Sequence, residues 1–176
     1  MSNSLQTPSP AKVSPNLDLM PTALETPNIS KHLGPIQEIA CLIKAKHPLI
    51  YVVTHEENRF LQDLYDQVIL PQSRELFTWS MHQGLVLYSP EKVFTKCSGD
   101  FEDTKSPVKA LVKIEEYVRE NTSSDTEVKL RGTVFLMKDM HVTLVPPVPR
   151  SLRDIYDHLI ANRKTIIIIS PSLAHG

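Results

Sequence analysis

The chain has 176 residues, a formal net charge of −1 and a hydrophobic content of 41%. This length leaves room for one ordinary domain with a sizeable core. The near-neutral charge gives no electrostatic reason to expect a nucleic acid or an anionic membrane as partner. Two cysteines, Cys41 and Cys97, are too few for a disulfide framework or a four-thiolate zinc site, which favours a reducing, cytoplasmic compartment.

The first 33 residues differ in composition from the rest of the chain. They hold Pro8, Pro10, Pro15, Pro21 and Pro27 among many serines, threonines and asparagines, with few bulky apolar groups. Such a segment buries too little apolar surface to offset the entropy of ordering it. The sequence therefore predicts a disordered tail over residues 1–33 and a folded domain over residues 34–176.

From Pro35 onward, predicted helices and strands alternate. Apolar residues at helical spacing predict helices over 36–43, 59–69, 108–121 and 152–161. Continuous apolar runs predict strands over 49–53, 76–80, 132–138 and 165–169, which suit interior positions, with a shorter strand at 85–88. None of these runs approaches the roughly 20 residues of a membrane span. Alternation of this kind indicates crossover connections, hence an α/β domain in three layers with a mostly parallel sheet, whose strand order is left open.

In open sheets of this class, ligands bind beyond the carboxyl ends of the strands. A phosphate loop between the first strand and its helix needs glycines, so that backbone amides can converge on the phosphate. Here that junction reads Thr54-His55-Glu56-Glu57, and no glycine lies in it. Thr54-x-x-Glu57 is instead the pattern of a capping box, and its two carboxylates would repel a phosphate. We expect no nucleotide-binding residues and no cofactor.

The run TVFLMKDMH has the form of a Walker B segment, in which Asp139 would face magnesium. Met140 follows it, where a catalytic glutamate would be needed. His55, Glu56, Asp139 and His141 are weak candidates for a zinc or manganese site, against the simpler interpretation of a solvated strand end. Because no G-x-S-x-G elbow is present, Ser170 and His82 are not expected to form a nucleophilic site, and no catalytic residue is predicted.

A second charged stretch, RSLRDIYDHL, follows three closely spaced prolines. Ser151-x-x-Asp154 again has the pattern of a capping box. Arg150 and Arg153 lie three residues apart and could reach one phosphate or carboxylate together. The alternative is a local ion-pair cluster with Asp154 and Asp157. The candidates for binding a protein partner are Arg150, Arg153, Glu56, Asp139 and Trp79, the last of these a core or crevice-wall aromatic.

Five segments together carry a resemblance: LIKAKHPLIYVVTHEENR, LFTWSMHQGL, GTVFLMKDMH, VPRSLRDIYDHL and KTIIIISPSL. Over about residues 35–173 the chain resembles the N-terminal domain of a family of AAA-type ATPases, known as a hypothetical reading frame of algal plastid genomes and from cyanobacteria. The resemblance implies a RecA-like fold without its own phosphate loop. It places the family's recurring positions at Thr54, Glu56, Glu57, Trp79, Lys138, Asp139, Arg150, Arg153 and Asp154.

The same resemblance puts the family's Walker motifs in a later module that these 176 residues do not contain. Three hypotheses follow. The first is a non-catalytic regulatory or interaction domain that binds a protein, either a AAA-type ATPase or another copy of itself, in the cyanobacterial cytosol or plastid stroma, with a role in photosynthetic and inorganic carbon physiology. The second is a fragment of a complete ATP-hydrolysing protein, although the polar leader before residue 34 favours an independent protein. The third is a metal-dependent enzyme.

Overall fold

The computed structural model describes residues 34–90, 103–120 and 132–172, so the tail predicted over residues 1–33 lies outside the described residues. The elements, in chain order, are α1 (Pro35–Lys44), β1 (Leu49–Val53), α2 (Glu57–Leu64), the π-helix η1 (Tyr65–Ile69), β2 (Glu75–Ser80), β3 (Gly84–Leu87), α3 (Pro107–Glu120), β4 (Thr133–Lys138), the 3₁₀-helix η3 (Met140–Thr143), α4 (Val148–Ala161) and β5 (Thr165–Ser170).

The strands form one sheet in the order β1-β5-β4-β2-β3, parallel except for the antiparallel pair β2 and β3. The two strands with the longest apolar runs, β4 and β5, lie in the interior, and every residue of β5 is buried. The prediction for 49–53 was wrong in one respect, because β1 is an edge strand and is only partly buried. Its composition is that of an interior strand, but one of its edges has no neighbouring strand among the described residues.

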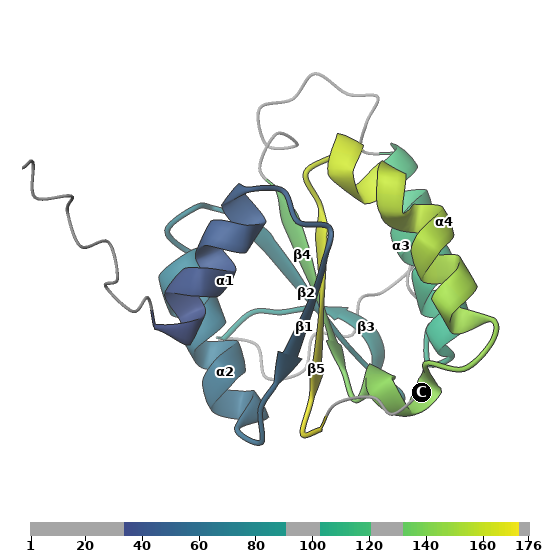
Figure 1. The fold of residues 1–176 in the computed structure, drawn as a ribbon, viewed down its shortest axis with the longest axis horizontal. Helices are drawn as coiled ribbons and strands as arrows, with labels where there is room; N and C mark the ends of the chain where they lie inside the picture. The colour runs from purple at the N-terminus through teal and green to yellow at the C-terminus, as the bar shows by residue number, and fades with distance from the viewer. Residues whose placement is uncertain (1–33, 91–102, 121–131, 173–176) are drawn as a thin grey trace, which may run out of the picture. The chain divides into compact units, whose positions relative to one another are not determined.

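Helices cover both faces of the sheet (Figure 1). Side chains alternate along β5: Ile167 and Ile169 pack against α1, α2 and η1, whereas Ile166 and Ile168 pack against α3 and α4. Two separate cores result, one on each face, because successive side chains of a strand point to opposite faces. The predicted three-layer, mostly parallel α/β fold is confirmed.

The helix boundaries differ from the predicted ones at two points that shape the site. The helix predicted to begin at residue 59 begins at Glu57 and ends in the π-helix η1. The helix predicted to begin at residue 152 begins at Val148, because Pro149 is tolerated in the first turn, where its missing amide has no partner to lose. Within the described residues, no helix is long and apolar enough to cross a membrane.

Candidate functional site

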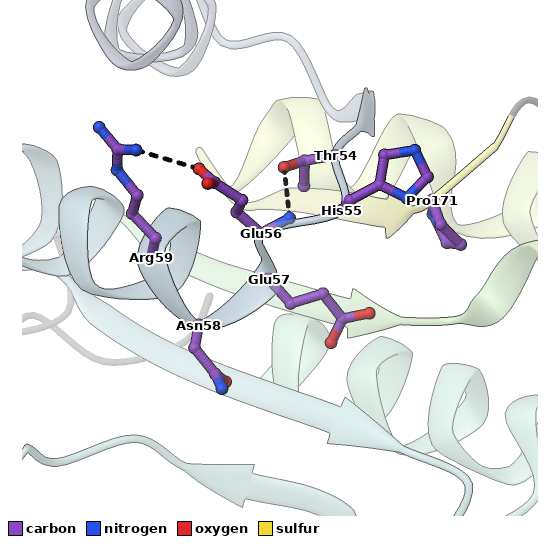
Figure 2. Close-up of a pocket in the computed structure, with 7 residues that line it drawn as sticks. All are labelled: Thr54, His55, Glu56, Glu57, Asn58, Arg59 and Pro171. Atoms are coloured by element: carbon purple, nitrogen blue, oxygen red, sulfur yellow. Dashed lines mark hydrogen bonds and ion pairs between the residues drawn. The ribbon is translucent and has the colours of Figure 1, made fainter.

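The carboxyl ends of β1 and β5 border an open hollow of about 500 Å³ (Figure 2). It is lined by Thr54, His55, Glu56, Glu57, Asn58, Arg59 and Pro171. The backbone amide of Thr54 donates to the carbonyl of Ser170 at 2.8 Å, so the ladder between the two strands continues to the rim of the hollow. This crevice is the position at which related sheets hold a ligand, since it lies at the carboxyl end of parallel strands.

Thr54 shapes the turn that leads into α2. Its hydroxyl accepts a hydrogen bond from the amide of Glu56 at 3.1 Å, and the residue at the N-cap of α2 is Glu56, whose side chain makes no capping bond. The predicted capping box of Thr54 and Glu57 is therefore wrong. The helix begins two residues later than the box requires, so the Thr54 hydroxyl closes a short turn instead of holding an amide inside the first helical turn.

The two glutamates of the junction point in different directions (Figure 2). A carboxylate oxygen of Glu56 lies 3.1 Å from Nη1 of Arg59, with both side chains largely in water. Glu57 lies 4.0 Å from Nζ of Lys138 at the end of β4, and these two side chains are 29% and 21% exposed. The second pair spans from the start of α2 to the central part of the sheet, and it puts an acid and its counter-ion where a phosphate loop would receive an anion.

The weak metal candidates do not gather into a site. Figure 2 shows His55 pointing away from Glu56. Asp139 is exposed and adopts a left-handed backbone with φ of 53° at the start of η3. The Nδ1 atom of His141 is buried and has no hydrogen-bond partner among the described residues. Across the described part of the chain, no three side chains of histidine, cysteine, aspartate or glutamate lie close enough together to hold a metal ion.

The two arginines of α4 behave differently. Nε of Arg150 lies 3.0 Å from a carboxylate oxygen of Asp154, so one of the two predicted local ion pairs forms. Arg153 and Asp157 have the same spacing and make no ion pair within the described residues. Ser151 lies inside the helix and its amide donates to the carbonyl of Pro147 at 3.1 Å, which makes the second predicted capping box wrong as well.

Trp79 is a core residue and offers no surface to a partner. It is 1% exposed, and its Nε1 donates a hydrogen bond of 2.6 Å to the carbonyl of Thr104. Ser170 is likewise buried, and its hydroxyl donates to the carbonyl of Ser172 at 2.6 Å, which closes the turn after β5. The pairing of Glu57 with Lys138 was not predicted, although the family resemblance marked both positions. The signal available in the sequence was a basic residue at the very end of an otherwise apolar strand.

The fold and the crevice define a class of protein: an α/β domain with a mostly parallel sheet, in which the junction after the first strand has no phosphate loop. The chain belongs to the family described as the SpoVK-like AAA ATPase N-terminal domain, whose model matches residues 35–175.

Two relatives share this domain. The chain is 27% identical over 133 residues to the AAA domain-containing protein ycf46 of Trieres chinensis, and 24% identical over 139 residues to the ycf46 protein of Guillardia theta. These matches cover 75% and 78% of this chain, but only 23% and 24% of the relatives. The chain thus spans about a quarter of the length of the curated relatives it matches. No solved structure matches it.

Proposed function

We propose that this domain is a non-catalytic regulatory and interaction domain that works with a AAA-type ATPase module or with other copies of itself. The observation that carries the proposal is the crevice after β1. It has the position of a nucleotide site, but two glutamates and a threonine stand where a phosphate loop would have glycines. Glu56 and Glu57 stand at the start of α2, where they complement the positive end of the helix dipole.

The proposal is supported by what a phosphate would meet at this junction. A phosphate is held by converging backbone amides, but the amide of Glu56 is already bonded to the hydroxyl of Thr54. Arg59, the cation that lines the hollow, is already paired with the carboxylate of Glu56, and Lys138 at the end of β4 lies beside the carboxylate of Glu57. An incoming anion would have to displace that carboxylate and would gain no glycine-lined cradle in return.

Titration calorimetry of the chain with Mg-ATP and Mg-ADP tests the proposal. We expect no binding in the micromolar range. The matched variant Glu56→Gln with Glu57→Gln removes both negative charges and leaves the backbone of the junction in place. It is expected to remain without a nucleotide site, because the missing cradle does not depend on those charges. A saturable micromolar site in the unmodified chain would overturn the proposal.

The proposal also covers the residues that contact a partner, the location of the protein and its physiological role. Candidates for partner contacts at the surface are Arg150, Arg153, Glu56 and Asp139, all of which are exposed. The resemblance to a plastid and cyanobacterial family supports a location in the plastid stroma or cyanobacterial cytosol and a role in photosynthetic and inorganic carbon physiology.

One alternative has an observation in its favour: the relatives are about four times as long as the matched region, so this domain can also serve as the N-terminal part of a complete ATP-hydrolysing protein.

A further inference from the structure

The outer face of α4 carries side chains that the fold itself does not use. The inner face packs Val148, Leu152, Ile155 and Leu159 into the core. On the opposite face, spaced three, four and three residues apart, lie the exposed residues Arg150, Arg153, Asp157 and Ile160. With 3.6 residues per turn, this spacing places them in one stripe along the helix. Because the inner face of α4 packs on the sheet, the stripe faces away from it; Figure 1 shows α4 beside α3 on that side of the sheet.

Among the residues that the structure describes, the charges of this stripe are only partly matched. Arg150 is paired with Asp154 one turn further along. Arg153 and Asp157 are exposed charges of opposite sign and neither makes an ion pair within the described residues. Ile160 is 38% exposed, and Tyr156 on the flank of the stripe is 41% exposed. The stripe therefore offers one unmatched cation, one unmatched anion and an apolar contact.

We propose that α4 pairs with α4 of a second copy of this chain, antiparallel, around a two-fold axis that crosses the outer face of the helix level with residue 155, midway between Arg153 and Asp157. The inference rests on the proposed interaction function and specifies the partner. In a two-fold contact, residue i of one copy faces residue j of the other and the reverse also holds. Positions 153 and 157 are equally far from residue 155, so Arg153 of each copy faces Asp157 of the other.

The same two-fold axis also brings the other two residues of the stripe, Arg150 and Ile160, opposite each other. Positions 150 and 160 are also equally far from residue 155, so the apolar stem of each Arg150 lies across Ile160 of the second copy. Spacing of three and four residues keeps all four positions on one side of the helix, so a facing helix can contact all of them. Ion pairs that stay near water contribute little each, and salt screens them, so the association is weak and weakens further as salt is added.

Charge exchange tests the proposal on the whole chain. Arg153→Asp puts two acids opposite each other at both contacts, and Asp157→Arg puts two arginines there. In sedimentation velocity over a concentration series at low salt, we expect the unmodified chain to form dimers. Each single variant should have a dimer dissociation constant at least about tenfold higher. An equimolar mixture of the two variants should recover dimers, because each acid then faces an arginine. The chain that carries both substitutions should recover them too.

The control is Arg59→Asp, the same change on α2 at the other face of the sheet, which should leave the dimer unchanged. Circular dichroism melting confirms that each variant is folded. An unmodified chain that stays monomeric at every concentration would overturn the inference. So would a mixture of folded single variants that associates no better than either variant alone. Neither result affects the Mg-ATP titration, so failure here is distinguishable from failure of the proposed function.

Discussion

At the carboxyl end of the sheet, several polar side chains pair with close neighbours in sequence and stay in water, whereas at the amino end polar side chains of distant elements pair with one another and two of them, Lys164 and Thr133, are buried. Glu56 and Arg59 illustrate the first case, with side chains 66% and 73% exposed. Lys164 illustrates the second: it is 4% exposed, and its Nζ donates a hydrogen bond of 2.8 Å to the hydroxyl of Thr133.

The amino-end network connects three elements, β2, α3 and β4, with the residue that precedes β5. A carboxylate oxygen of Glu75, at the start of β2, accepts hydrogen bonds from the hydroxyls of Tyr117 on α3 at 2.5 Å and of Thr133 on β4 at 3.3 Å. Nζ of Lys164, just before β5, lies 5.7 Å from the ring centroid of Tyr117. Burial raises the pKa of the Tyr117 hydroxyl well above its ordinary value, and the bond to Glu75 adds to this. We therefore expect substitutions in the amino-end network to cost more stability than substitutions of the exposed side chains at the carboxyl end.

The largest expected effect is at the amino end. Lys164→Ala removes the hydrogen bond to Thr133 and the contact of the ammonium group with the Tyr117 ring, so we expect a loss of about 2 kcal/mol in the free energy of unfolding. Urea denaturation followed by circular dichroism measures it. The matched control Lys105→Ala, at an exposed lysine, should change stability by less than about 0.5 kcal/mol. An equal effect of the two substitutions would contradict the comparison.

The loss of stability caused by Lys164→Ala should depend on pH. Burial lowers the pKa of Lys164 below its ordinary 10.5, with the nearby charge of Arg74 acting in the same direction and that of Glu75 opposing both. Between the lowered pKa and 10.5 the unfolded chain holds the proton more tightly than the folded chain, so Lys164 contributes stability that increases with pH. The difference in stability between the unmodified chain and Lys164→Ala should therefore grow as pH rises through this window. A difference that shrinks would mean that the pKa of Lys164 is raised instead.

An intermediate effect is expected at the turn before α2. Thr54→Ala removes the acceptor of the Glu56 amide, which should cost about 0.5–1.5 kcal/mol because the bond is made at an exposed site. Thr54→Ser keeps a hydroxyl and is the control, with an expected loss of less than half of that. Equal denaturation midpoints for the unmodified chain and Thr54→Ala would show that the hydroxyl does not hold the turn.

The smallest effect is expected for Glu56→Gln. The pair with Arg59 lies in solvent, where exposed ion pairs contribute between about 0 and 1 kcal/mol, so the change in stability should be close to the error of the measurement. Arg59→Gln removes this pair and the longer one with Asp63, both in solvent, so its effect should also be small. A loss above about 1 kcal/mol in either variant would mean that the carboxyl end contributes to the fold as the amino end does.

The fold class and most element positions could be predicted because they depend on local patterns. Strands β4 and β5 follow directly from their apolar runs, and the inner faces of α1 and α3 follow from helical spacing. The edge position of β1 could not be predicted, since a strand covered on both faces has the same composition at an edge. The π-helix at Tyr65–Ile69 also gave no signal, because its apolar residues fit an ordinary helix equally well.

The site was predicted less well than the fold. A capping box requires both a sequence pattern and a helix that begins at the right residue, and neither α2 nor α4 begins where its pattern implied. The missing phosphate loop was predictable because glycine is needed there for a steric reason. Lys164 was not predicted as buried, since its partners Thr133, Glu75 and Tyr117 are brought to it only by strand order and crossover packing.

Trp79 also gives the molecule a single built-in fluorophore, because it is the only tryptophan in the chain. Its indole lies in the core between the sheet and the α3 and α4 layer, hydrogen-bonded to a backbone carbonyl and shielded from water. Its emission therefore reports on the integrity of that core and not on the side chains around the crevice. Quenching by acrylamide should be slight in the folded chain and strong after unfolding, and a ligand that binds at the strand ends should leave the emission unchanged unless it disturbs this core.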